Sequence, residues 1–254
     1  MDSIFFRMIS SGSKGNCTVI WDSSSLIILD FGISVKRFST FMDGIDVKFD
    51  ETALFISHEH SDHCKGAKSL LNKRNIDLYS RKGTLEAMGI ESGYRIRNEL
   101  AIGNFHVTAV DVSHDASEPV AYVVRSGGRK ISVVSDLGQV SEELLKQSRD
   151  SDILAFEANH DLEMLKTGSY PFPLKRRIMS DSGHLSNEQS AEAISKMAKI
   201  DSDIILTHIS QENNRPEIAL NTVRNYLENR SIGYGSIQCA YQDTGTPVMS
   251  IQRL

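Results

Sequence analysis

The stretch that decides the fold is "FISHEHSDHCKG", residues 55–66. It continues the apolar run "ALFI", residues 53–56, which predicts a short buried strand. Three histidines and two acidic residues follow within six positions, namely His58, Glu59, His60, Asp62 and His63. Imidazole and carboxylate groups bind zinc and similar ions, so this density predicts a metal site. In an irregular loop, His58 and His60 would face one ion, and Asp62 and His63 would face a second.

The bulk composition describes an ordinary globular chain. It has 254 residues, of which 40% are hydrophobic and 24% charged, and we expect one domain over residues 1–254. The formal net charge of −5 disfavours an indiscriminate nucleic-acid binder but leaves room for a local basic patch. There is neither a signal-peptide pattern at the N-terminus nor an apolar run of 18 residues, which predicts no membrane association.

The three cysteines favour a cytoplasmic location. Cys17, Cys64 and Cys239 are widely spaced and form no CxxC pair, which is typical of a reducing compartment. Cys64 follows His63 directly, but we interpret it as a small packed thiol in preference to a metal ligand.

The remaining pattern places strands mostly first and mixed αβ units second. Turn chemistry and apolar runs predict strands at 4–9, 17–21, 26–29, 53–56, 78–79, 105–112, 121–124, 131–134, 153–156 and 203–206. Helical periodicity predicts helices at 65–72, 83–88, 141–147, 187–199 and 216–229. Together these elements favour a sandwich of sheets with helices outside.

Further ligands are needed, because one loop supplies too few for two ions. Three candidates stand just past predicted strands: His114 in "VDVSHDA", Asp136 in "VVSDLG" and His208 in "IILTHIS". A single histidine in such a place is more often structural. Three residues at matching places, beside the histidine-rich loop, favour a shared metal site.

With these motifs the chain resembles the metallo-β-lactamase-fold hydrolases over nearly its whole length. The resemblance implies an α/β fold, the αββα four-layer sandwich of two packed mixed sheets with helices on the outer faces. It implies that His58, His60 and His114 bind a first metal ion, that Asp62, His63 and His208 bind a second, and that Asp136 bridges the two. Asp30 in "LDFG" would steady the metal loop, although an aspartate capping a turn at a strand end is an alternative.

Other motifs are similar to the tRNase Z-type phosphodiesterases and, more closely, to the WalJ/YycJ-type subgroup. These motifs are "SSGSKGNC", "HEHSDHCKG", "SHDASEP", "EANHD", "YPFPLKRRI", "GHLSN" and "THISQENNRPE". By this resemblance His184 is a candidate general acid and Glu157 the residue that orients it. A local hydrogen bond at the start of a helix is the alternative for His184. Asp62 is a second catalytic candidate, as an aid to proton removal.

The resemblance implies a dinuclear-metal phosphodiesterase, a DNA exonuclease in which a metal-bridging hydroxide is the nucleophile. Zinc is the favoured ion, with manganese or iron left open. Contacts with a nucleic-acid substrate, DNA being favoured, are expected from Lys14, Lys175, Arg176, Arg177 and His160. A solvated face is the plainer interpretation of the basic run, and a tight turn that of the segment around Lys14.

Three alternatives stay open at this point. The first is a small-molecule hydrolase on the same scaffold, such as a lactonase or a cyclic-nucleotide phosphodiesterase. The second is an RNA-processing nuclease, and the third is a binding module with little activity. Oligomeric state, strandedness and cleavage polarity are not predicted.

Overall fold

The structure is a computed structural model, and it describes residues 3–254. The chain forms two compact units. Unit 1 comprises the described part of Met1–Ala109, together with Ala116–Arg129 and Tyr241–Leu254; unit 2 comprises Val110–Asp115 and Lys130–Ala240. The single domain expected from the sequence stays a prediction.

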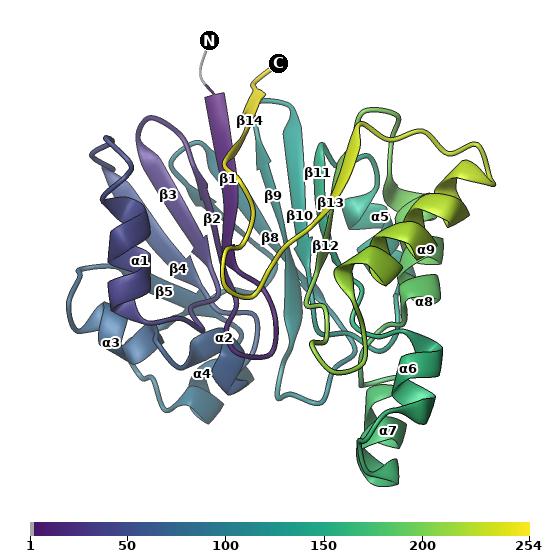
Figure 1. Ribbon diagram of the computed structural model, residues 1–254. Helices are drawn as coiled ribbons and strands as arrows, with labels where there is room; N and C mark the ends of the chain where they lie inside the picture. The colour runs from purple at the N-terminus through teal and green to yellow at the C-terminus, as the bar shows by residue number, and fades with distance from the viewer. Residues whose placement is uncertain (1–2) are drawn as a thin grey trace. The chain divides into compact units, whose positions relative to one another are not determined.

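Unit 1 contains a mixed seven-stranded sheet in the order β14-β1-β2-β3-β4-β5-β6. Its first four strands pair antiparallel, and β3 to β6 pair parallel. Figure 1 shows the two ends of the chain side by side in this sheet, as strands β1 and β14. The strands are β1 (Ser3–Ser10), β2 (Cys17–Trp21), β3 (Ser25–Leu29), β4 (Glu51–Phe55), β5 (Asp77–Ser80), β6 (Tyr94–Arg95) and β14 (Met249–Gln252).

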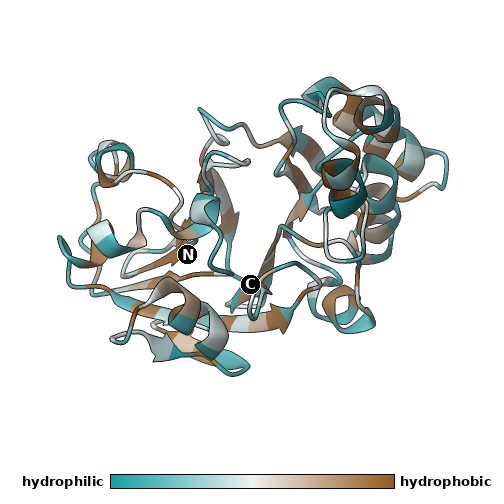
Figure 2. Cartoon of the chain, turned by 90° about the horizontal axis from the view of Figure 1, so that it is seen from below, coloured by the Kyte–Doolittle hydropathy of each residue, from teal (hydrophilic) through white to brown (hydrophobic). Residues whose placement is uncertain are grey.

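The hydrophobic pattern explains why β2 and β3 lie at the centre of this sheet. Every residue of both strands is buried, as expected for strands covered on both faces. Figure 2 shows brown and teal alternating along the helices, as expected for helices with one buried face. The helices of unit 1 are α1 (Val35–Met42), α2 (Ser61–Cys64), α3 (Ala67–Leu71) and α4 (Lys82–Met88). Phe38 of α1 and Leu70 of α3 belong to the same core cluster as β2 and β3, and such buried side chains contribute roughly 1.5–3 kcal/mol each.

A second seven-stranded sheet contains β7 to β13. In unit 1, β7 (Glu99–Ile102) pairs antiparallel with β8 (Phe105–Asp111) through a turn at Gly103, whose φ of 52° favours glycine. Strand β9 (Val120–Ser126) also belongs to unit 1.

Unit 2 contains the parallel part of the second sheet. Strands β10 (Arg129–Val134), β11 (Ile153–Glu157), β12 (Asp203–Thr207) and β13 (Ser236–Cys239) are parallel neighbours in that order. Its helices are α5 (Glu142–Ser148), α6 (Leu162–Thr167), α7 (Phe172–Ile178), α8 (Asn187–Met197) and α9 (Pro216–Glu228). Because the strands are parallel, all their carboxyl ends meet at one edge of the sheet.

Local signals fix the helix ends of unit 2. Ser141 caps α5, as predicted, by accepting a hydrogen bond from the Leu144 N–H. Ser186 and Gln189 form a reciprocal capping box at the start of α8. The predicted inner face of α8 is confirmed, since Ala191, Ile194 and Met197 are all buried.

The predicted class, two mixed sheets flanked by helices, is confirmed. One local prediction was wrong, because Ser61–Cys64 forms a single helical turn with His60 as its N-cap and not an irregular loop. The expected helix at 65–72 is correspondingly shorter, beginning at Ala67. Across residues 3–254, none of the helices is both long and apolar enough to span a membrane.

Candidate metal and acid–base site

In unit 1, three imidazoles gather at the carboxyl end of β4. The strand ends at Phe55 and α2 begins six residues later, at Ser61, so the histidines share one tight bend. The ring centroid of His58 lies 4.7 Å from that of His60 and 4.1 Å from that of His63. His58 and His63 are buried, whereas His60 and Asp62 are partly exposed. The structure thus brings together all four predicted ligands of this unit.

Asp30 fixes the orientation of His63. Its Oδ2 atom accepts a 2.7 Å hydrogen bond from His63 Nδ1, and its Oδ1 atom accepts one from the Ser57 N–H at 2.8 Å. Holding the proton on Nδ1 leaves the Nε2 lone pair as the ligand atom of His63. Asp30 has a φ of 59°, a left-handed conformation that aspartate tolerates better than most residues. Asp30 therefore does contact the histidine loop, as the sequence predicted.

Asn16 is a residue that the sequence analysis missed as a partner of this loop. Its Nδ2 atom lies 2.9 Å from His63 Nε2 and 3.2 Å from Asp62 Oδ2, and its Oδ1 atom accepts from the Gly12 N–H at 2.8 Å. The hydrogen bond from Gly12 orients the side-chain amide of Asn16 so that its Nδ2 atom donates to His63 Nε2. This agrees with a lone pair on Nε2 of His63. The available signal was its place in "SSGSKGNC", beside two glycines.

In unit 2, the candidate residues follow the ends of adjacent parallel strands. Asp136 comes after β10, Glu157 ends β11 and His208 comes directly after β12. His208 Nδ1 lies 3.6 Å from Asp136 Oδ1 and 3.3 Å from Glu157 Oε2. Asp136 and His208 have φ angles of 57° and 51°, and such a backbone costs on the order of 1–3 kcal/mol per residue and persists only where the surrounding contacts enforce it. Strain of this kind is typical of a functional site.

His114 joins this group from the segment after β8. Its Nδ1 atom lies 3.1 Å from the Gly183 carbonyl oxygen, which accepts the proton and leaves Nε2 as the ligand atom. Nε2 lies 3.8 Å from Asp136 Oδ1 and 3.3 Å from Asp115 Oδ1. Burial lowers the pKa of His114 below its ordinary value, against the opposing charge of Asp136, and the neutral form is the one that binds metal.

The buried Glu157 and the partly exposed His184 form an acid–base pair. Glu157 is 0% exposed, and its Oε2 atom lies 3.0 Å from His184 Nδ1. Burial alone would raise the pKa of Glu157, but the charge and hydrogen bond of His184, with a hydrogen bond from His208, lower it to about 2. Burial alone would lower the pKa of His184, but the charge and hydrogen bond of Glu157 raise it above its ordinary value. The pair therefore favours a protonated imidazole facing a carboxylate.

The backbone contacts of Glu157 separate its role from that of a metal ligand. Oε1 accepts from the Leu185 N–H at 2.8 Å, and Oε2 accepts from the Asp136 N–H at 2.8 Å in addition to His184. Both oxygens are thus used as acceptors inside the protein. Glu157 ties Asp136 and the segment of His184 to the end of β11.

A buried amide network, also missed from the sequence, supports the same segments. Asn159 Nδ2 donates to the His208 carbonyl oxygen at 2.9 Å. Asn214 Nδ2 donates to Asn187 Oδ1 at 2.8 Å, and Asn187 Nδ2 donates back to Asn214 Oδ1 at 3.1 Å. Asn187 begins α8, three residues after His184, so this pair joins the segment of His184 to the segment after His208. Asn214 lies in "NNRPE", where two adjacent asparagines before a proline were the available signal.

The donor chemistry of both units fits divalent metal ions. Unit 1 offers three imidazoles and a carboxylate, and in unit 2 the Oδ1 atom of Asp136 lies 3.8 Å from His114 Nε2 and 3.6 Å from His208 Nδ1. His63 and His114 each hold the Nδ1 proton on a fixed acceptor, an arrangement typical of metal-binding histidines. Nitrogen and oxygen donors of this kind suit zinc, and also manganese and iron.

The residues expected to contact substrate differ in how they are engaged. Lys175 Nζ donates to the carbonyl oxygens of Lys166 and Gly168, both at 2.7 Å, and so caps the end of α6. Arg177 Nε donates to Asp115 Oδ2 at 2.5 Å. Arg176 is exposed on α7. These three roles in substrate binding stay predictions.

Lys14 and His160 lie in contrasting environments. Lys14 is exposed, and its carbonyl oxygen accepts a hydrogen bond from Lys65 Nζ. His160 is 1% exposed, and its Nδ1 atom has no hydrogen-bond partner among residues 3–254. Burial lowers the pKa of His160 to about 4, which keeps it neutral. Its contact with substrate stays a prediction that this burial does not support.

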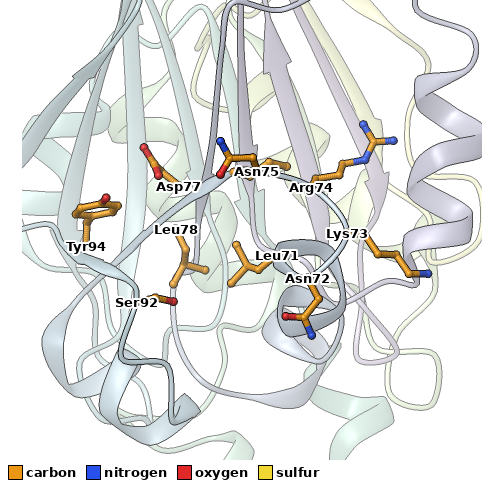
Figure 3. Close-up of a pocket in the computed structure, with 10 residues that line it drawn as sticks. Leu71, Asn72, Lys73, Arg74, Asn75, Asp77, Leu78, Ser92 and Tyr94 are labelled. Atoms are coloured by element: carbon orange, nitrogen blue, oxygen red, sulfur yellow. The ribbon is translucent and has the colours of Figure 1, made fainter.

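A separate cavity of about 480 Å³ lies in unit 1, between the turn after α3 and strand β6. Figure 3 shows Lys73, Arg74 and Asn75 on one side of it and Ser92 and Tyr94 on the other. It adjoins the start of β5, whereas the histidine loop follows the end of β4, the parallel neighbour of β5. The cavity has neither histidine nor cysteine in its lining and is no candidate for the metal chemistry.

Comparison with known proteins shows similarity over most of the chain. A family model described as the Beta-lactamase superfamily domain matches residues 49–209. Exodeoxyribonuclease YycJ of Bacillus anthracis is 32% identical over 243 residues, covering 91% of this chain and 92% of that protein. Exodeoxyribonuclease WalJ of Streptococcus pneumoniae serotype 2 (strain D39 / NCTC 7466) is 34% identical over 262 residues, covering 97% of each. The crystal structure of the metallo-beta-lactamase fold protein YhfI from Bacillus subtilis matches with a TM-score of 0.72 at 15% identity, covering 99% of this chain and 100% of that one.

Proposed function

Because the chain belongs to the beta-lactamase superfamily and, within it, to the family of the YycJ and WalJ exodeoxyribonucleases, we propose that it is a dinuclear-metal DNA exonuclease. The observation that carries the phosphodiesterase assignment is the pair of the buried Glu157 and the partly exposed His184 beside Asp136 and His208. Hydrolysis of a phosphodiester breaks a P–O bond and expels a sugar alkoxide, which needs a proton donor, whereas simple metal binding needs no such pair.

We propose that the ligands implied by family membership hold two divalent ions. His58, His60 and His114 would hold one ion, Asp62, His63 and His208 the other, and Asp136 both. Support comes from family membership, from the order of the motifs along the chain and from the fixed Nδ1 protons of His63 and His114. When bound, such ions lower the pKa of a coordinated water toward 7 and offset charge on the phosphate.

The protein's own side chains would carry the proton transfers. With Nδ1 of His184 hydrogen-bonded to Glu157, the second ring nitrogen, Nε2, is the one that would give a proton to the leaving oxygen. Glu157 holds that ring and stabilises its charged form. Asp62, partly exposed at the histidine loop, would help to remove the proton from the attacking water.

Turnover of end-labelled oligonucleotides tests this proposal. The purified chain, loaded with zinc or with manganese, is given DNA and RNA labelled at the 5′ or the 3′ end, as single strands and as duplexes. We expect stepwise shortening of DNA. If neither nucleic acid is shortened with either metal and a lactone is opened rapidly, the proposal is wrong.

A further inference from the structure

We propose that one exposed face of helix α7, made of Phe172, Arg176 and Met179, binds the single-stranded end of the DNA substrate. The inference rests on the proposed function, because it names the strand that reaches the same site. These residues have spacings of four and three, which places them on one side of a helix. Figure 1 shows α7 at the far end of unit 2, beyond α6 and α8.

The exposure of this face is unusual for its composition. Phe172 is 73% exposed and Met179 is 45% exposed, although both are large apolar side chains. A helix of seven residues that turns a phenylalanine toward solvent gains nothing for its own stability from that ring. An exposed aromatic ring beside a guanidinium group is the combination that binds unpaired bases and phosphates.

The charge of the segment is complementary to a nucleic-acid strand. Residues 164–180 contain four basic side chains and no acidic one, in a chain with a formal net charge of −5. The structure separates these cations by their contacts. Lys166 pairs with Glu163, Lys175 caps the end of α6, and Arg177 binds Asp115. Arg176, on the face with Phe172, is exposed and makes no such contact with residues 3–254, so it is the cation best placed to meet a phosphate.

Direct contacts connect α7 to the acid–base pair within unit 2. The Ile178 carbonyl oxygen accepts from the His184 N–H at 2.9 Å. Arg177 reaches Asp115, the neighbour of His114 in the chain. A strand that lies along α7 therefore leads toward the His184 segment.

The length of the face indicates how many nucleotides it would contact. At a rise of about 1.5 Å per residue, the seven steps from Phe172 to Met179, the residue that caps α7, extend about 10 Å. Stacked nucleotides repeat at about 3.4 Å, so the face matches about three of them. Bases in a duplex are already paired and stacked, and Phe172 would accept a base from a single strand only.

The experiment is a binding measurement with a fluorescently labelled 12-nucleotide DNA strand, made with metal-free protein in chelator so that no cleavage occurs. We expect Phe172→Ala to weaken binding about 10-fold, within the range of 1–3 kcal/mol for one stacked base. Phe172→Trp should bind at least as tightly as the unaltered protein. Arg176→Gln should reduce the slope of log Kd against log salt by about 0.7.

Two matched substitutions in unit 2 serve as controls. Ile200→Ala removes an apolar side chain that is 80% exposed. Lys146→Gln removes an exposed cation of α5, and Figure 1 shows helix α5 at the opposite end of unit 2 from α7. Neither should change binding by more than twofold. Thermal unfolding should be unchanged in all five variants, because exposed substitutions alter stability by about 0.5 kcal/mol or less.

The outcomes separate this inference from the proposed function. If the strand binds and Phe172→Ala weakens that binding, the inference holds even if no nucleic acid is later cleaved. If Phe172→Ala and Ile200→Ala bind alike, or the unaltered protein does not bind the strand at all, the inference is overturned. It is also overturned if Phe172→Ala lowers only self-association of the chain, since the face would then be an interface between copies.

Discussion

Replacing Asp30 by asparagine changes a proton position and very little else. Asparagine adopts a φ near 59° as readily as aspartate does, so the backbone is preserved. Its oxygen keeps the hydrogen bond from the Ser57 N–H, and its amide group then takes the place of Oδ2, 2.7 Å from His63 Nδ1. Two N–H donors would face each other there. The contact is relieved if the proton of His63 moves from Nδ1 to Nε2, which gives up the hydrogen bond that Nε2 accepts from Asn16 Nδ2 at 2.9 Å.

That shift removes the lone pair through which His63 would bind metal. We expect the affinity for zinc to fall 10–100-fold, which is usual when a group that holds a ligand is lost. This corresponds to about 1.4–2.7 kcal/mol. Loss of a hydrogen bond to a charged group should also lower the free energy of unfolding by roughly 1.5–3 kcal/mol.

The assay is competition for zinc against a chromophoric chelator, with denaturant unfolding of the metal-free protein beside it. Asp22→Asn is the matched control, since Asp22 is a buried aspartate of the same unit that also accepts backbone N–H groups, from Ser24 and Ser25, each at 2.8 Å. It should lose stability and keep its affinity for zinc. Unchanged zinc affinity in folded Asp30→Asn, or an equal loss in Asp22→Asn, would refute the reasoning.

Three further predictions concern other parts of the chain. His184→Ala should keep its metal and lose about 10²–10⁴-fold in kcat, and adding Glu157→Gln to it should lower kcat little further, because the two residues act as one unit. Steady-state kinetics with metal analysis would check this, and a double variant whose loss in kcat is the product of the two single losses would contradict a shared role. Asn214→Ala should lower the free energy of unfolding by about 1–3 kcal/mol in a denaturant titration, because it leaves buried polar groups without partners; an unchanged midpoint would contradict this. Burial alone would raise the pKa of Asp22, but hydrogen bonds, among them one from Arg253, lower it from 3.8 to about 2. The ionised carboxylate therefore contributes on the order of 2 kcal/mol to the free energy of unfolding above pH 4, and this contribution is lost as the pH falls through 2. Denaturant unfolding of Asp22→Asn should show a smaller loss of stability between pH 4 and pH 2.

The sequence predicted those parts of the fold in which local pattern and burial agree. Cys17–Trp21 was predicted to the residue, because it is an unbroken apolar run between turn residues and is buried at every position. The residues that follow the parallel strands were found for a related reason. A polar side chain directly after an apolar run is conspicuous, and the ends of parallel strands meet at one edge of the sheet.

Elements with weak local patterns were missed. Helix α7 has Pro171 before it and Pro173 within its first turn, a pattern that also suits a loop. Strand β6 has only two residues, both exposed, and shows no hydrophobic alternation. Strands β13 and β14 are short and partly exposed, and their composition does not indicate a strand. Their extended conformation follows from pairing with β12 and β1.

The supporting asparagines could not have been identified from the sequence alone. Asn16, Asn159 and Asn214 act through contacts with residues 27 to 56 positions away, and nothing local distinguishes them from asparagines in a turn. The same holds for the basic run of α7. Only the structure separates Lys175 and Arg177, which bind groups within unit 2, from the exposed Arg176.

Metal content per chain is the most direct test of the central claim. The protein is purified, stripped with chelator, reloaded with zinc or manganese and desalted, and the ions are counted by elemental analysis. We predict two ions per chain in the unaltered protein, and fewer in both His58→Ala, from unit 1, and His208→Ala, from unit 2, with loss of DNA shortening in each. A chain that takes up no ion, or one whose content is unaffected by both substitutions, would contradict the account.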